Sequence, residues 1–276
     1  MDFKQRTREI RRLTLTCIAS LGVGHVGGSL SIAEALSVLY SKHMSFDPKN
    51  PGMEGRDRLV LSKGHAGPAL YATLASFGFF DKEELKTLNR LGTKLPSHCN
   101  MLLTPGVDMT AGSLGQGISC GVGLAIGSKL RNDGAKIYVI VGDGECQEGQ
   151  VWEAAMLAAH KKLDNLVVLV DNNKMQIDGL TENVCGIEDV ASKFDAFGFN
   201  TVRVNGNDEE EIDRALCEAD NVKGLKLRAR ATGELSNAQI NLEGQLKEAS
   251  KYSPDNSGAG GSTPGDGNGE EENPLG

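Results

Sequence analysis

The chain has 276 residues, a hydrophobic content of 39% and a formal net charge of −8 at pH 7. This length suits one large α/β domain, and no run of about eighteen apolar residues occurs, so the sequence predicts no membrane span. Residues 253–276 contribute −5 of the charge, so the remainder carries only −3 and gives no electrostatic case for binding nucleic acid.

The N-terminus and the cysteines indicate the compartment. The chain begins MDFKQRTREIRR, which is charged and lacks the apolar core of a secretion signal. The six cysteines are scattered and form no CxxC pair, which argues against a disulfide framework and against a zinc site. We therefore expect a cytoplasmic protein with free thiols.

Two helices separated by a glycine-rich loop are predicted for the N-terminal part. Apolar spacing favours a helix over Phe3–Leu21, and the loop 22–29 then places four glycines around His25. Taken alone, this loop is most simply a flexible turn with a solvated histidine. Ser31 is expected to cap a second helix that ends near His43. We interpret His43 as a structural residue, because the end of a helix favours a cation.

Two further histidines lie in the next segments. The run DRLVLS predicts a strand over Asp57–Ser62, and His65 follows it between two glycines at the start of a helix. That position suits an anion, although a simple helix cap is the alternative. His98 lies in an irregular segment, where a histidine is uninformative by itself.

The stretch from residue 137 to residue 177 predicts a strand, a helix and a second strand. The strands are Ile137–Val141 and Leu166–Val170, and the helix between them is Gln147–Lys161. Such a unit has parallel strands whose carboxyl ends meet at one edge of the sheet, so Asp143 and Asn173 should lie close together. Carboxylate and amide oxygens suit Mg²⁺, whereas an acidic turn and an Asn cap are the alternative interpretation of the pair.

The sequence predicts that the whole chain divides into three regions. Residues 1–224 should form a doubly wound, mostly parallel sheet flanked by helices. Residues 225–252 diverge, with LKLRARA permitting an edge strand by its alternation and with a helix after it. Residues 253–276 are rich in Gly, Ser, Asn and Glu and are expected to be a disordered acidic tail.

Several segments, in this order, resemble the transketolase family of thiamine-diphosphate enzymes: GHVGGSLS, SKGHAGPALYA, GSLGQG, GDGECQEGQVWEAA and LVDNNKMQIDG. The resemblance covers roughly Arg8–Gly224 and implies the fold of the family's diphosphate-binding domain. Ser113 stands where large single-chain transketolases have proline, as in small, split ones. The first loop departs from the usual GHPG and is similar to deoxyxylulose-phosphate synthase, but SKGHAGPALYA favours transketolase.

The resemblance also implies a role for individual residues. Asp143, Asn173 and the main-chain oxygen of Met175 would hold Mg²⁺, or Ca²⁺ or Mn²⁺, which in turn holds the diphosphate of thiamine diphosphate. The other residues implied to contact the cofactor are His65, Gly112, Leu114, Gly144 and Glu145. The histidines implied to act in the substrate channel are His25, His65 and His98. The glutamates implied to lie at the subunit contact are Glu148 and Glu153, for which an ordinary solvated helix start is the alternative.

By the same resemblance, the chain supplies half of an active site. The family activates the aminopyrimidine with a glutamate from a second domain, which this sequence lacks. The resemblance therefore implies the N-terminal subunit of a two-gene transketolase of the pentose phosphate pathway, moving a two-carbon ketol unit between sugar phosphates. The partner would be a C-terminal, pyrimidine-binding subunit, and the assembly α₂β₂.

Three alternatives stay open. The chain can belong to another thiamine-diphosphate enzyme, either deoxyxylulose-phosphate synthase-like or a sugar-specific transketolase relative. It can be a catalytically impaired cofactor-binding paralogue, because no histidine follows His160 where the family has another active-site histidine. It can also be a structural α/β module with accidental motifs.

Overall fold

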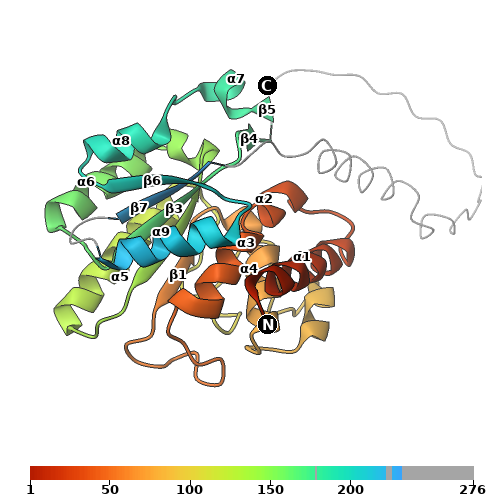
Figure 1. The fold of residues 1–276 in the computed structure, drawn as a ribbon. Helices are drawn as coiled ribbons and strands as arrows, with labels where there is room; N and C mark the ends of the chain where they lie inside the picture. The colour runs from red at the N-terminus through yellow and green to blue at the C-terminus, as the bar shows by residue number, and fades with distance from the viewer. Residues whose placement is uncertain (178, 222–225, 232–276) are drawn as a thin grey trace, which may run out of the picture.

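A five-stranded parallel sheet forms the centre of the molecule (Figure 1). The structure, a computed structural model, describes residues 1–177, 179–221 and 226–231. The strand order is β1-β2-β3-β7-β6, and every neighbouring pair is parallel. The strands are β1 (Arg58–Leu61), β2 (Ile137–Gly142), β3 (Leu166–Asn172), β6 (Asn200–Asn205) and β7 (Lys226–Ala231). After β3, a short antiparallel pair forms from β4 (Met175–Gln176) and β5 (Gly179–Leu180).

Helices cover both faces of this sheet. One face packs against α1 (Phe3–Ala19), α3 (Ala33–Val38), α4 (Gly67–Ser76) and α9 (Glu209–Asn221). The other face packs against α5 (Gln116–Arg131), α6 (Gly149–Lys161) and α8 (Val190–Ala196). The shorter helical segments are α2 (Val26–Leu30), η1 (Leu39–His43), η2 (Gly64–Ala66), η3 (Lys82–Thr87), η4 (Gly144–Gln147) and α7 (Thr181–Cys185). None of the helices in the described ranges has the length and apolar character to cross a bilayer.

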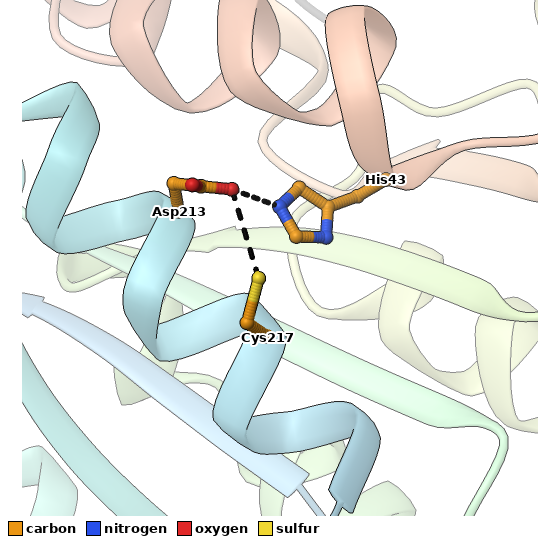
Figure 2. A group of neighbouring side chains, drawn as sticks. All are labelled: His43, Asp213 and Cys217. Carbon is orange, nitrogen blue, oxygen red and sulfur yellow. Dashed lines mark hydrogen bonds and ion pairs between the residues drawn. The ribbon is translucent and has the colours of Figure 1, made fainter.

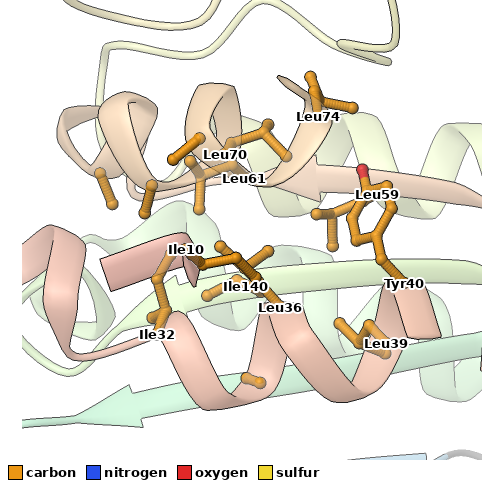
Figure 3. Close-up of a cluster of buried hydrophobic side chains, with 14 of the residues drawn as sticks. Ile10, Ile32, Leu36, Leu39, Tyr40, Leu59, Leu61, Leu70, Leu74 and Ile140 are labelled. Carbon is orange, nitrogen blue, oxygen red and sulfur yellow. The ribbon is translucent and has the colours of Figure 1, made fainter. Parts of the chain in front are cut away.

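The period-two alternation of the strands divides the core between the two faces. In β1, Leu59 and Leu61 point into the cluster with α1, α3 and α4 (Figure 3). Val60, between them, belongs to the cluster with α5 and α6. Full burial of each such side chain contributes about 1.5–3 kcal/mol. A strand buried on both faces therefore needs apolar residues throughout, which is why β2 has the continuous sequence IYVIVG.

Glycines bring α5 close to the sheet. A Cβ on Gly117 would lie 2.6 Å from the Cα of Ser62, and one on Gly121 would collide with the side chain of Val139. These glycines cost helix propensity but allow the helix to approach β1 and β2. This approach fixes the loop 112–115 against the carboxyl end of β1.

The position of β7 corrects the expectation of an edge strand over LKLRARA. Lys226–Ala231 lies inside the sheet, between β3 and β6, and β6 forms the edge. Alternation along one strand predicts that it belongs to a sheet, but the crossover connections decide which strands it pairs with. The boundary predicted at residue 224, the helix predicted after the strand within 225–252 and the tail predicted over 253–276 lie outside the described residues.

The N-terminal loop also differs from the expectation. Val26–Leu30 forms α2 with His25 as its N-cap residue, and the next helix, α3, has Ile32 at its N-cap. Ser31 therefore does not cap that helix: its hydroxyl donates instead to Oδ2 of Asp171. A short polar side chain satisfies either role equally well, so local sequence favours the cap while the tertiary fold selects the carboxylate.

Candidate functional site

The strand register brings Asp143 and Asn173 to one edge of the sheet. Gly142 pairs with Asp171, and the backbone N–H of Asp143 donates to the carbonyl of Asp171 at 3.1 Å. The two predicted residues therefore follow neighbouring strand ends, each beside its partner strand. Both side chains are buried: Asp143 is 3% exposed and Asn173 is 9% exposed.

The segment after β3 holds the Asp143 carboxylate in place. Its Oδ2 accepts a hydrogen bond from the N–H of Lys174 at 2.8 Å and one from the Thr181 hydroxyl at 3.1 Å. Burial, followed by the negative charge of Asp171, raises the pKa of Asp143 above its usual value. A buried carboxyl beside a second acid is a group whose charged form a cation would stabilise.

Asn173 is oriented by two hydrogen bonds. Its Oδ1 accepts from the N–H of Met175 at 2.9 Å, and its Nδ2 donates to Oδ2 of Asp171 at 3.2 Å. Next to it, a Cβ on Gly144 would lie 2.8 Å from Oε1 of Gln176, so a larger residue here would have to displace the Gln176 side chain. The oxygens of Asp143 and Asn173 are the hard donor set that suits a divalent cation of the magnesium type.

A buried ion pair, not foreseen in the sequence, lies behind these residues. Lys63 and Asp171 are each 1% exposed, and Nζ of Lys63 lies 2.6 Å from Oδ2 of Asp171. The same oxygen accepts from Ser31 and from Asn173, so three elements meet there. The only hint in the sequence is that Lys63 and Asp171 both stand at the carboxyl ends of buried strands.

Two of the three predicted channel histidines are in ring contact, and the charge of the third, His98, acts on His65. The ring centroids of His25 and His65 are 5.2 Å apart in an edge-to-face arrangement. A Cβ on Gly112 would lie 3.8 Å from the Cβ of His98, which places His98 beside the loop 112–115. Gly28 leaves room for the group, since a Cβ there would lie 3.0 Å from the His65 ring.

His65 is held in its neutral form. Burial lowers its pKa to about 3, and the charges of Lys63, His25 and His98 act in the same direction, whereas Asp171 opposes them. A neutral imidazole offers one N–H donor and one nitrogen acceptor. At neutral pH, His65 is therefore available to donate one hydrogen bond and to accept another from a substrate hydroxyl, and its low pKa makes it a weak base in the protein without ligands.

Glu145 ties together the loops that frame the site. Its side chain is 2% exposed, with Oε1 accepting from the N–H of Gly115 at 2.8 Å and Oε2 from the N–H of Gly142 at 3.0 Å. The Ser62 hydroxyl donates to Oε1 as well. These bonds join the carboxyl ends of β1 and β2 to the start of α5, which gives the side chain a structural use inside the protein.

Comparison with known proteins identifies the family. Residues 3–227 match the family described as transketolase, thiamine diphosphate binding domain. The chain belongs to the transketolase family. The resemblance stated from the sequence motifs is therefore confirmed, and so is the predicted α/β fold with a parallel sheet between helices.

Relatives of this transketolase chain include proteins named as subunits. It is 52% identical to the 6-deoxy-6-sulfo-D-fructose transketolase subunit of Clostridium sp. (strain MSTE9), over 81% of this chain and 82% of that one. It is 40% identical to the apulose-4-phosphate transketolase subunit of Phocaeicola vulgatus, over 76% of this chain and 74% of that one.

Solved transketolases share the fold. The structure from Campylobacter jejuni is 34% identical, with a TM-score of 0.80 over 92% of this chain and 44% of that chain. The structure from Leishmania mexicana is 32% identical, with a TM-score of 0.79 over 84% of this chain and 36% of that chain. This transketolase chain thus spans less than half the length of these solved relatives.

The structure gives the positions of several further predicted residues, while their roles stay predictions. Gly112 and Leu114 lie exposed on the loop before α5, and Met175 lies in β4, shortly after Asn173. Glu148 precedes α6 and Glu153 lies within it, both exposed, so their predicted place at a subunit contact stays a prediction. The same holds for the roles predicted for the histidines and for Glu145.

Proposed function

We propose that this chain binds the diphosphate half of thiamine diphosphate in a two-chain transketolase that moves a two-carbon ketol unit between sugar phosphates. The observation that carries the proposal is the strand-end cluster, in which Asp143 and Asn173 lie beside a buried ion pair and His65 lies beside the same lysine. Two relatives named as transketolase subunits match this chain over most of their own length, which supports a separate partner chain.

Asp143 and Asn173 would hold Mg²⁺, and the main-chain oxygen of Met175 would complete the protein ligands. The support is chemical: Mg²⁺ takes one or two carboxylates together with phosphate oxygens and water. Burial and the neighbouring Asp171 carboxylate raise the pKa of Asp143, so a cation bound there would stabilise its charged form. Ca²⁺ or Mn²⁺ would use the same oxygen donors. The Lys63–Asp171 pair would keep Asn173 in position through its hydrogen bond to Asp171.

The histidines would then handle protons. Thiamine diphosphate, when bound, supplies the carbon nucleophile and the electron sink for breaking the ketose C–C bond. His65, neutral at physiological pH, would exchange a proton with a hydroxyl of the donor or acceptor sugar. His25 and His98, which are exposed beside it, would bind and orient other hydroxyls of the same substrate.

The partner would be a C-terminal subunit carrying the pyrimidine-binding domain, in an α₂β₂ assembly. The exposed side chains of α6, including Glu153, Met156 and Leu157, offer a mixed polar and apolar surface for such a contact. Glu148 lies at the start of this helix, next to Gly115 of the loop 112–115: a Cβ on Gly115 would lie 2.9 Å from the Cβ of Glu148. A contact at Glu148 would therefore reach the loop 112–115, which is predicted to touch the cofactor.

The proposal is tested by assaying the chain with and without a C-terminal transketolase subunit, with thiamine diphosphate and Mg²⁺ present. Ketol transfer from a ketose phosphate should require both chains. Transfer by this chain alone would contradict the division into subunits. A stable pair that binds cofactor but transfers nothing would favour the catalytically impaired paralogue.

A second candidate concerns the sugar. The 52% identity to a 6-deoxy-6-sulfo-D-fructose transketolase subunit favours a sulfonated ketose as the donor in place of a pentose phosphate pathway sugar. Parallel assays with 6-deoxy-6-sulfo-D-fructose and with a ketose phosphate would separate the two, since the preferred donor should show the higher kcat/KM.

A further inference from the structure

Three side chains of the types that bind metal ions lie close together, as Figure 2 shows. His43 ends η1, and Asp213 and Cys217 lie one turn apart on α9. The carbonyl of His43 accepts from the hydroxyl of Tyr138, the second residue of β2, at 3.1 Å. The cluster therefore lies toward the amino end of the strands, whereas Asp143 follows the carboxyl end of β2.

The donor atoms converge on one point. Nε2 of His43 lies 2.7 Å from Oδ1 of Asp213, and Sγ of Cys217 lies 3.9 Å from the same oxygen. All three donor atoms fall within 4.8 Å of one another. The His43 side chain is only 4% exposed and that of Asp213 is 19% exposed, so the donors are held by the surrounding packing.

The chemistry of these donors selects the cation. An imidazole nitrogen, a carboxylate oxygen and a sulfur together suit zinc, while magnesium and calcium prefer oxygen alone. We propose that His43, Asp213 and Cys217 form a binding site for a thiophilic divalent cation of the zinc type, joining η1 to α9. Three protein ligands leave a fourth position for water, and two anionic ligands balance the charge of the ion.

Lys42 would compete with a metal ion for the carboxylate of Asp213. Its Nζ lies 2.7 Å from Oδ2 of Asp213, so in this structure a lysine ammonium supplies the positive charge that the carboxylate requires. The Lys42 side chain is 49% exposed, and a half-exposed ammonium is able to turn into solvent when a divalent ion takes its place. Binding should therefore strengthen when this lysine is removed and weaken when a ligand is removed.

The test is a metal titration of the full chain after treatment with a chelator. Zn²⁺ should bind with a stoichiometry of one at this site, and Co²⁺ should give the charge-transfer absorption of a cobalt–thiolate bond. Cys217→Ser and His43→Gln should each lower the Zn²⁺ affinity by at least about tenfold. Losing a residue that only hydrogen-bonds to a metal ligand already costs about that much, so losing a ligand should cost no less. Lys42→Met should raise the affinity.

Cys185→Ser is the matched control, because Cys185 is exposed on α7 and does not belong to the cluster. It should leave the cobalt spectrum and the Zn²⁺ affinity unchanged. A cobalt–thiolate band that is absent from the wild-type chain, or that persists in Cys217→Ser, would overturn the proposal. The Lys42→Met variant keeps the ligands intact, so unchanged or weaker Zn²⁺ binding in that folded protein would overturn it as well.

Discussion

Replacing Lys63 by methionine tests the buried ion pair at the cofactor edge. Methionine keeps an unbranched side chain of similar length in the same space but removes the ammonium that lies 2.6 Å from Asp171. Asp171 is 1% exposed, so water is unable to replace the lost partner. The Lys63→Met chain should therefore be markedly less stable than the wild type.

The magnitude follows from burial and from the remaining hydrogen bonds. Removing one member of a buried ion pair costs about 3–5 kcal/mol, because the other charge is left uncompensated. Ser31 and Asn173 would still donate to the Asp171 carboxylate, which places the expected loss near the lower end, about 3 kcal/mol. For a domain of this size, such a loss lowers Tm by roughly 6–12 °C.

Urea unfolding followed by circular dichroism measures this loss in the free chain, with Lys86→Met as the control. Lys86 forms a pair with Glu83 at 2.7 Å, but these side chains are 55% and 75% exposed, so the loss should be at most about 0.5 kcal/mol. Adding Asp171→Asn to Lys63→Met should restore part of the stability, because no buried charge then remains unpaired.

Equal unfolding free energies for the wild type and Lys63→Met would refute this reasoning. So would a double variant less stable than Lys63→Met alone, since that would show that Asp171 contributes independently of its lysine.

Three further predictions concern the candidate site. Asp143→Ala should abolish Mg²⁺-dependent binding of thiamine diphosphate in the assembled enzyme, and calorimetry showing unchanged affinity would remove Asp143 from the metal site. His65→Ala and His98→Ala should each lower turnover by on the order of 10²–10⁴, the usual range for the loss of an acid–base group. His160→Ala is the control and should change turnover little. Equal losses at all three positions would contradict a special role for His65 and His98. Burial lowers the pKa of His65 to about 3, below the value near 6.5 of an unfolded histidine, so the unfolded chain takes up this proton first as pH falls. His65 should therefore make unfolding easier as pH drops from about 7 toward 3, and His65→Gln should lose less stability than the wild type over that range in urea titrations at each pH.

The strand ends on which the site depends could be located from the order of the residues. The apolar runs before Asp143 and Asn173 have the length and composition of buried strands, and the helix between them requires a parallel, right-handed connection. Such reasoning needs only neighbouring residues and short-range periodicity. It therefore predicts the bounds of β1 and β2 to within one residue of those observed. The motifs in those strand ends were likewise enough to indicate the transketolase family.

Which distant side chains meet depends instead on how the elements pack. Lys63 and Asp171 are 108 positions apart in the chain, and His43 and Asp213 are 170 apart, so no local pattern links either pair. The absence of CxxC pairs argued against a zinc site, yet the packing of η1 on α9 brings His43 and Asp213 together with a cysteine one turn farther along. The interior position of β7 also depends on packing. The crossover connections between elements decide which strands pair in a parallel sheet, and the alternation within one strand carries no information about them.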